Sequence, residues 1–317
     1  MSCLAMENPS EQATKVARQT VRMAMIAAGR FLSAAGIESP RLDAELLLRH
    51  VLGMNQAEFY LHIDDAIRPD LELGLWPLLQ RRARREPLAY ITGHKEFWSL
   101  DFTVTPDVLI PRPETELLLE AALERTRPMP KSPLKILDIG TGSGAIAVCL
   151  AKELREAQIS AVDISSAALQ VARENAERHG VADRIRFAQG DLFGPLAEER
   201  GSFDLILANP PYIRSGDLAE LAPEIREWEP IVALDGGADG LDIYRRIVSQ
   251  CRGHLANEGH LMFEIGDAMA KAVEQIIAGA GGFETAALLR DYAGKDRVIA
   301  TRKRPSLEPV AKGSGRG

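Results

Sequence analysis

The chain of 317 residues is long enough for two domains with sizeable cores, and 46% hydrophobic and 26% charged residues are ordinary values for a globular protein. Its formal net charge of −7 argues against direct, non-specific binding of nucleic acid, which requires a basic surface. The three scattered cysteines and six histidines show neither a disulfide framework nor metal-ligand spacing, and no apolar run reaches the length of a membrane span. Because the N-terminus also lacks the apolar core of a signal peptide, we expect a cytoplasmic protein without a metal ion.

The first part of the chain has the pattern of a helical bundle. Apolar residues recur at helical spacing, and Ser39 with Pro40 supplies an N-cap and a first-turn proline. The predicted helices cover about 14–35 and 39–52, begin again near 56, and cover 69–85. We therefore expect a disordered N-terminus over residues 1–13 and a small helical domain over 14–86.

A basic run, Arg81-Arg82-Ala83-Arg84-Arg85, closes this predicted bundle. We interpret it as a solvated face near a helix C-terminus, where cations suit the helix dipole. The alternative is a dock for an acidic partner surface, but a single run of charges is weak support for that role.

Residues 87–113 break the helical pattern and predict a β-hairpin that links two domains. Aromatic and β-branched residues gather in three short runs, Tyr90-Ile91-Thr92, Glu96-Phe97-Trp98 and Phe102-Thr103-Val104. The segment then stiffens, with prolines on both sides of Arg112, and Pro113 stands at a plausible helix start. Its simplest function is to begin the next helix, and the alternative is that it carries Arg112, Glu114 and Glu116 toward a site in the next domain.

From Leu134 onward, strand and helix patterns alternate. Predicted strands cover 135–139, 158–163, 184–188, 203–208, 259–265, 284–289 and 297–301, and predicted helices follow the first, second, fourth and fifth of them. The last two strands are too close in sequence for a crossover helix and must form an antiparallel pair. The alternation predicts an α/β fold, a doubly wound, mostly parallel seven-stranded sheet, over residues 114–304, followed by a flexible tail at 305–317.

Three polar or glycine-rich sites follow the first three of these strands. Gly140-Thr141-Gly142-Ser143-Gly144 stands between the first strand and its helix, where glycines let the backbone approach a ligand. Asp163 ends the second strand, where an acid meets ribose hydroxyls. Asp191 and Leu192 follow the third strand and are suited to the amino group and the ring of adenine. Each site alone is a common turn or cap, but the ordered series predicts a nucleoside pocket.

The fourth strand ends at Asn209-Pro210-Pro211-Tyr212. Two consecutive prolines stop the hydrogen-bond ladder, because neither has an N–H and each fixes φ. Such a strand end, at the ligand-binding edge of an open sheet, leaves carbonyls free to accept from a planar NH₂ group. Asn209 could add an acceptor and Tyr212 a stacking face, whereas the simpler alternative is a proline-rich turn.

These motifs resemble those of the class I S-adenosylmethionine-dependent methyltransferases that act on amino or amide nitrogens. Across residues 20–302 the chain is similar to the release factor glutamine methyltransferases (the HemK-like, or PrmC, family). The similarity rests on a helical N-terminal domain followed by Thr-Gly-His-Lys-Glu-Phe-Trp (92–98), Leu-Ile-Pro-Arg-Pro-Glu-Thr-Glu (109–116), Asp-Ile-Gly-Thr-Gly-Ser-Gly (138–144) and Asn-Pro-Pro-Tyr (209–212).

The resemblance implies transfer of a methyl group from S-adenosylmethionine to N5 of the glutamine in the Gly-Gly-Gln loop of class 1 peptide-chain release factors. It implies S-adenosylhomocysteine as a product, a substrate-binding helical domain, and an enzyme that we expect to be a monomer. We assign cofactor binding to Gly140, Thr141, Gly142, Ser143, Gly144, Asp163, Asp191, Leu192 and Asn209. We assign catalysis to Asn209, Pro210, Pro211 and Tyr212, and substrate binding to these four together with Arg112 and Glu114.

Two other functions fit parts of the sequence. An adenine-N6 methyltransferase of DNA or RNA would use the same Asn-Pro-Pro-Tyr motif, but the net charge and the lack of a long target-recognition insertion argue against it. A nucleotide-binding interaction module would leave Asn209 and Tyr212 without a role.

Overall fold

The computed structural model describes residues 19–129 and 133–305, which form two compact units divided between Thr92 and Gly93. The expected disorder at 1–13, the start of the first predicted helix and nearly all of the expected tail at 305–317 lie outside the described residues. Of the helices within the described ranges, none combines the length and the apolar character needed to cross a membrane.

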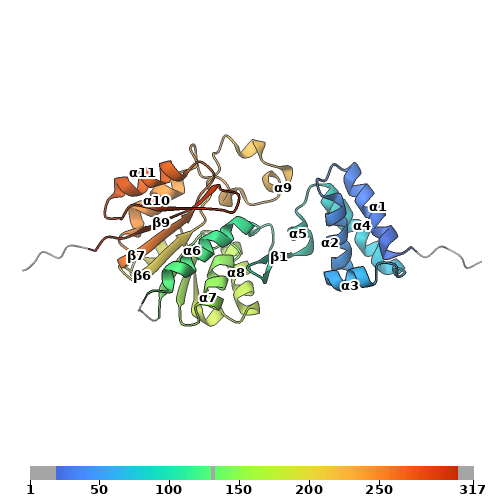
Figure 1. Ribbon diagram of the computed structural model, residues 1–317, viewed down its shortest axis with the longest axis horizontal. Helices are drawn as coiled ribbons and strands as arrows, with labels where there is room; N and C mark the ends of the chain where they lie inside the picture. Colours follow the sequence, from blue (N-terminus) through green and yellow to red (C-terminus); the bar gives the residue numbers. More distant parts are fainter. Residues whose placement is uncertain (1–18, 130–132, 306–317) are drawn as a thin grey trace, which may run out of the picture. The chain divides into compact units, whose positions relative to one another are not determined.

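The first unit is helical (Figure 1). Its helices are α1 (Val21–Ala34), α2 (Pro40–Leu52), α3 (Gln56–Leu61), α4 (Pro69–Ala83) and α5 (Leu88–Thr92). Leu32, Leu47 and Phe59 are fully buried in its core. Gly53 ends α2 in the left-handed conformation, with φ of 65°. Burial of one apolar stripe from each helix therefore accounts for the bundle.

Two predictions for this unit are wrong. Tyr90-Ile91-Thr92 belongs to helix α5 and not to a strand, because Tyr90 and Ile91 are both buried and Ile91 packs into the bundle core. Tertiary packing has overridden their β propensity. The basic run is not a fully solvated face either, since Arg82 is buried and its Nε donates to Asp43 at 2.6 Å. Arg81 Nε donates to Glu86 at 2.8 Å.

The second unit contains a β-hairpin and a seven-stranded sheet with helices on both faces. Its elements are β1 (His94–Phe97), β2 (Leu100–Thr103), η1 (Pro113–Thr115), α6 (Glu116–Thr126), β3 (Lys135–Ile139), α7 (Ala145–Glu153), β4 (Gln158–Asp163), α8 (Ser166–Arg178), η2 (Ala182–Arg184), β5 (Ile185–Gln189), η3 (Gly194–Leu196), β6 (Phe203–Ala208), η4 (Leu218–Glu220), α9 (Pro223–Arg226), η5 (Ile231–Ala233), α10 (Asp242–Cys251), β7 (Leu255–Glu264), α11 (Ala270–Ala280), β8 (Ala287–Arg290) and β9 (Asp296–Arg302). The sheet order is β5-β4-β3-β6-β7-β9-β8, and β9 is antiparallel to both of its neighbours. The predicted fold class, with its linking hairpin and its antiparallel last pair, is confirmed.

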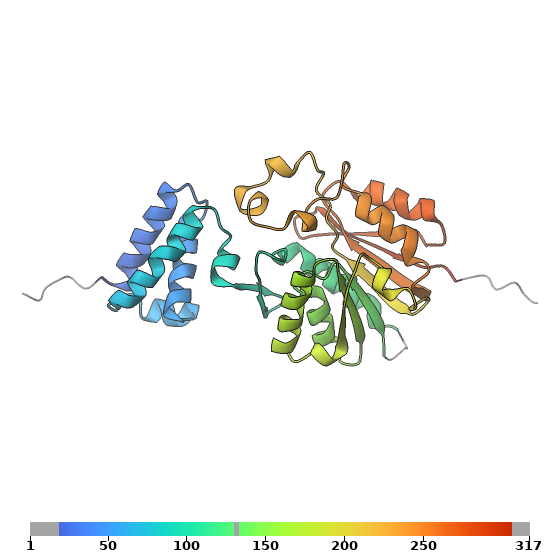
Figure 2. The same ribbon diagram turned by 180° about the vertical axis from the view of Figure 1, so that it is seen from behind.

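Helices α6, α7 and α8 lie on one face of the sheet and α10 and α11 on the other (Figures 1 and 2). Two apolar cores result, one on each side of the sheet. Cys149 and Cys251, which the sequence places on apolar helical faces, are both buried. Strands covered on both faces explain why β6 is buried at all six of its positions.

The register brings the ends of the central strands together. Ile139 of β3 pairs with Val162 of β4 on one side and with Ala208 of β6 on the other. Successive strands are added outward from β3 toward β5, and then outward from β6 toward β7, so the order reverses between β3 and β6. The residues that follow β3, β4 and β6 therefore lie at one edge, beside the switch point where open α/β sheets bind ligands.

Candidate active site

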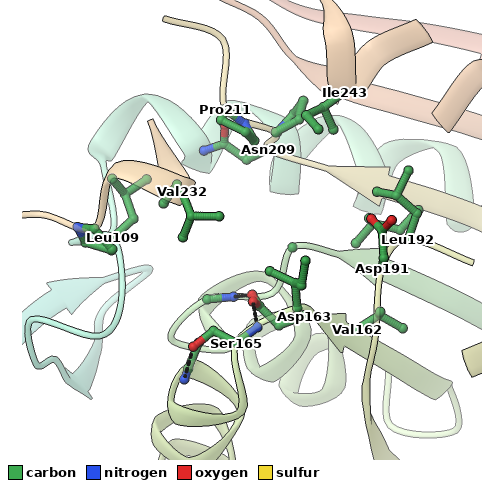
Figure 3. A pocket seen from close by; sticks show the side chains of 18 of the residues that line it. Leu109, Val162, Asp163, Ser165, Asp191, Leu192, Asn209, Pro211, Val232 and Ile243 are labelled. Atoms are coloured by element: carbon green, nitrogen blue, oxygen red, sulfur yellow. Dashed lines mark hydrogen bonds between the residues drawn. The ribbon is translucent and has the colours of Figure 1, made fainter. Parts of the chain in front are cut away.

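A cavity of about 510 Å³ opens at this edge, within the usual size range of small-molecule sites. Figure 3 shows it enclosed by residues from several elements, with Asn209 and Pro211 opposite Asp163 and Ser165, Asp191 and Leu192 on a third side, and Leu109 and Val232 on a fourth. The lining is mostly apolar with a few polar groups, which is typical of a site for an organic cofactor.

The glycine-rich turn after β3 is one wall. Gly140 and Gly142 line the cavity with φ of 74° and 55°, a backbone conformation that residues with a Cβ rarely adopt. Gly144, with φ of 80°, is needed for packing instead, because a Cβ there would lie 3.0 Å from the Cβ of Ala172 on α8. The turn thus brings backbone close to a ligand on one side and close to helix α8 on the other.

Asp163, at the end of β4, holds the glycine-rich turn by a hydrogen bond. Its Oδ2 accepts from the backbone N–H of Gly142 at 2.9 Å, and its Oδ1 accepts from that of Ser165 at 2.9 Å. Burial raises the pKa of the carboxyl, and these backbone donors partly offset that rise. A carboxylate has about four lone-pair sites, so acceptor capacity remains for a ligand hydroxyl.

Asp191 and Leu192 follow β5 on the third side. The Asp191 carboxylate pairs with Arg246 of α10, which also lines the cavity. Leu192 is nearly buried and has φ of 50°, an uncommon conformation for a residue with a side chain. The positive φ turns a large apolar side chain against the cavity, as a flat ring would require.

Asn209 is anchored by a residue far away in the sequence. Its Nδ2 donates to Oγ1 of Thr115, in the turn before α6, at 3.1 Å. Because the nitrogen is engaged, the amide presents Oδ1 as its remaining acceptor. Pro210 and Pro211 line the cavity beside it.

Tyr212 does not line this cavity. A Cβ at Gly266 would lie only 3.1 Å from the Tyr212 ring, so the ring packs directly on that backbone. Burial raises the pKa of its phenol, and the nearby Glu264 carboxylate adds to the rise. Tyr212 supports the Asn-Pro-Pro segment from behind in this structure.

The loop between β6 and α10 packs on the same segment. The backbone N–H of Ile213 donates to Leu234 O at 3.0 Å, and that of Gly236 donates to Ile213 O at 2.8 Å. A Cβ at Gly240 would lie 2.4 Å from Tyr212 O, so only glycine fits. Ile231 and Val232, both mostly exposed, extend from this loop along the cavity.

The remaining predicted site residues surround the cavity without lining it: Thr141, Ser143, Gly144, Arg112 and Glu114. Thr141 donates through Oγ1 to Asp138 at 2.7 Å, and burial raises the pKa of that Asp138 carboxyl to about 7. Arg112 pairs with the buried Glu229, whose Oε2 also accepts from Ile110 N at 3.2 Å. The stiff segment is therefore tied to the loop between β6 and α10.

Sequence reasoning missed three polar residues that hold the site in place: Thr115, Glu229 and Asn175. Asn175 of α8 accepts from Thr103 N at 2.7 Å and donates to Ser143 O at 2.9 Å, which joins the hairpin to the glycine-rich turn. A polar residue on the apolar face of a predicted helix was the available signal for Asn175. No local signal exists for a partner that is 94 residues away, as Thr115 is from Asn209.

Comparison with known proteins defines the class and then the family. Residues 130–228 match the family described as methyltransferase domain, and residues 24–93 match the PrmC N-terminal domain. The protein is a methyltransferase. It is 44% identical to the release factor glutamine methyltransferase of Geobacter sulfurreducens, over 89% of this chain and 96% of that one. The identity to the enzyme of the same name from Moorella thermoacetica is also 44%, over 90% and 99% of the two chains.

A solved structure from Alicyclobacillus acidocaldarius is described as a release factor-specific protein-(glutamine-N5) methyltransferase and shares 31% sequence identity with this chain. The match covers 64% of this chain and all of that chain, with a TM-score of 0.39. On the sequence identities and coverages, the chain belongs to the release factor glutamine methyltransferase family.

Proposed function

We propose that this protein transfers a methyl group from S-adenosylmethionine to the side-chain N5 of the glutamine in the Gly-Gly-Gln loop of class 1 release factors, and so modulates translation termination. The observation that carries the proposal is the anchored amide of Asn209, beside Pro210 at the edge of a nucleoside-sized cavity. The family's named activity agrees with this chemistry.

The residues around the cavity fit S-adenosylmethionine. The positive-φ glycines 140 and 142 leave room for a ligand against the backbone. Asp163 retains acceptor capacity for ribose hydroxyls, while Asp191 and Leu192 offer an acceptor and an apolar surface for adenine. When bound, this cofactor supplies an electrophilic methyl group.

The contribution of the chain is to orient the acceptor. An amide nitrogen is a poor nucleophile because its lone pair is delocalised. Asn209 Oδ1 and the Pro210 carbonyl would accept the two hydrogens of the substrate amide and so fix the direction of its nitrogen. Such positioning supplies several kcal/mol, up to roughly 7–11 in the best cases. As positive charge develops on the nitrogen, the same oxygens bind it more strongly than they bind the ground state.

The helical unit is proposed to dock the protein substrate. Its exposed apolar side chains, among them Leu73 at 75% and Leu61 at 78%, are suited to a protein contact. Removing residues 1–92 should abolish methylation of intact release factor and spare S-adenosylmethionine binding, measured by calorimetry as a check of folding. Full activity of the truncated enzyme would contradict this role.

One assay separates the proposed function from its rivals. Labelled S-adenosylmethionine is incubated with the enzyme and with release factor, duplex DNA or no acceptor in parallel. We expect label on release factor alone. Label on DNA would establish the adenine-N6 alternative, and cofactor binding without transfer to either would favour a binding module. A cytoplasmic location, a monomeric state and the absence of direct nucleic-acid binding stay predictions.

A further inference from the structure

Two polar residues that lie outside the cavity lining, Thr115 and Glu264, connect to Asn209 in series. Asn209 Nδ2 donates to Thr115 Oγ1 at 3.1 Å. The Thr115 side chain also contacts the Glu264 carboxyl, and a hydroxyl that faces a carboxylate is the donor, because the carboxylate can only accept. Thr115 and Glu264 are 5% and 1% exposed. The order of the series is therefore amide, hydroxyl, carboxylate, with each proton pointing toward Glu264.

The position of Glu264 follows from the sheet. Ala208 of β6 pairs with Phe263 of β7, so the next positions along the two adjacent parallel strands are Asn209, just after β6, and Glu264, the last residue of β7. Thr115 comes from the turn before α6, between Pro113 and the helix. Three segments that are remote in sequence thus meet behind the substrate end of the cavity.

Glu264 is not explained as a stabilising ion pair. Within residues 19–129 and 133–305, its Oε2 is buried and has no hydrogen-bond partner. The nearby cations have other partners, because Arg297 pairs with Asp291 at 3.1 Å and Arg112 pairs with Glu229. A buried carboxylate without a counter-ion contact destabilises a protein relative to an apolar residue. Its presence at this position calls for a role other than stability.

The donors and acceptors available on these three side chains define such a role. A hydroxyl has one proton, and when that proton is directed to Glu264 the oxygen can only accept from Asn209. The Asn209 amide must then turn Nδ2 toward Thr115 and leave Oδ1 as the acceptor. Without the carboxylate, the hydroxyl could donate to Oδ1, and the amide could flip to present a donor where the substrate's own N–H groups need an acceptor.

We propose that Thr115 and Glu264 are positioning residues that fix the orientation of the Asn209 amide, so that Oδ1 accepts from the substrate nitrogen. This inference rests on the proposed function, in which Asn209 receives the substrate amide. Neither residue touches substrate in this account, and both act through Asn209.

A double-mutant cycle tests the inference. Thr115→Val keeps the shape and removes the hydroxyl, and should lower kcat by about tenfold to 100-fold, because a misdirected contact loses positioning. Thr115→Ser keeps the hydroxyl and should restore near wild-type kcat. The Kd for S-adenosylmethionine should be unchanged in both. In an Asn209→Ala background, Thr115→Val should cause no further loss.

The cycle distinguishes positioning from structural support. If Thr115→Val slows the Asn209→Ala enzyme by the same factor as the wild type, Thr115 does not act through Asn209 and the inference fails. Glu264→Leu gives a second arm with the same expectation, and Glu264→Gln should be intermediate, because its amide can either accept from or donate to Thr115. Equal rates for Glu264→Leu and the wild type would also overturn the inference.

Failure of the proposed function would look different. If the wild-type enzyme does not methylate release factor, that function fails before any variant is compared. The side-chain NH₂ resonances of Asn209, assigned by their loss in Asn209→Ala, then provide a readout that needs no substrate. Thr115→Val should shift them and speed their exchange with solvent, whereas Thr115→Ser should not. Unchanged resonances in Thr115→Val would refute the inference independently.

Discussion

The ends of strands β4 and β6 present the same kind of feature, a polar side chain at the carboxyl edge of a buried strand, but they are built differently. Asp163, the last residue of β4, accepts from Gly142 and Ser165, which are 21 and 2 residues away. Asn209 after β6 donates to Thr115, which is 94 residues away. The first site is assembled from neighbouring turns, and the second depends on the tertiary fold.

The difference corresponds to two tasks, which are binding the cofactor and aligning the substrate amide. A cofactor with a fixed shape can be bound by adjacent turns of one βαβ unit, which form wherever that unit forms. A substrate amide must be aligned with the reacting methyl group, and that alignment requires an acceptor whose direction is fixed from behind. In our proposal, Thr115 in the turn before α6 and Glu264 at the end of β7 fix this direction through Asn209.

The largest expected effect is on the rate of methyl transfer, from a change at Asn209 after β6. Asn209→Ala should fold normally and reduce methyl transfer by about 10²–10³-fold, the scale for removing one preorganised polar contact to a transition state. The measurement is the single-turnover rate on release factor, with thermal melting as the control. Wild-type rates would reduce Asn-Pro-Pro-Tyr to a strand-ending turn and remove the contrast between the two sites.

A smaller effect, on the affinity for the cofactor, is expected at Asp163 at the end of β4. Asp163→Ala should weaken S-adenosylmethionine binding, by roughly 1.5–3 kcal/mol for each hydrogen bond that a charged acceptor loses. Calorimetry measures the affinity. Asp183→Ala is the matched control, because it removes an exposed carboxylate of the same unit that does not line the cavity. The control should bind the cofactor normally, and unchanged affinity in Asp163→Ala would disprove the pocket assignment.

The smallest expected effect is on the pH dependence of the free energy of unfolding, through Glu264. Burial raises the pKa of this carboxyl from 4.5 to about 7, so the folded state binds its proton more tightly than the unfolded state does. The associated stability is present below the unfolded pKa and is lost as pH rises through about 7. Glu264→Gln should remove this loss and gain roughly 3 kcal/mol over the wild type above pH 8.

Urea unfolding of both proteins between pH 5 and 8.5 measures this difference. Asp138, with a pKa also near 7, titrates in both proteins, so the comparison isolates Glu264. Parallel stability curves for the two proteins would show that Glu264 is not strained by its burial.

The sequence predicts the second unit well because its patterns are local. The β3, β4 and β6 boundaries at 135–139, 158–163 and 203–208 are those of the structure, since continuous apolar runs between glycine or proline signals leave little ambiguity. The glycine-rich turn, Asp163, Asp191 and Asn209 come together as expected, because parallel strands end at one edge of a sheet.

Predictions from the sequence fail where a residue distant in the chain determines the local structure. The segment Tyr90-Ile91-Thr92 has β propensity, but burial against the bundle makes it helical. Arg82 belongs to a basic run, but Asp43 in another helix gives it a buried partner. Thr115 and Glu264 stand in patterns that suggest only a helix start and a strand end, and the fold alone brings them to Asn209.

The most direct test of the account is to locate the methyl group. Release factor is incubated with S-adenosylmethionine and either the wild-type enzyme or Asn209→Ala, and the peptide that contains Gly-Gly-Gln is sequenced by mass spectrometry. We expect one added methyl group on the glutamine side chain with the wild type, and almost none over the same time with Asn209→Ala. Methylation of another residue, or equal modification by both enzymes, would contradict the account.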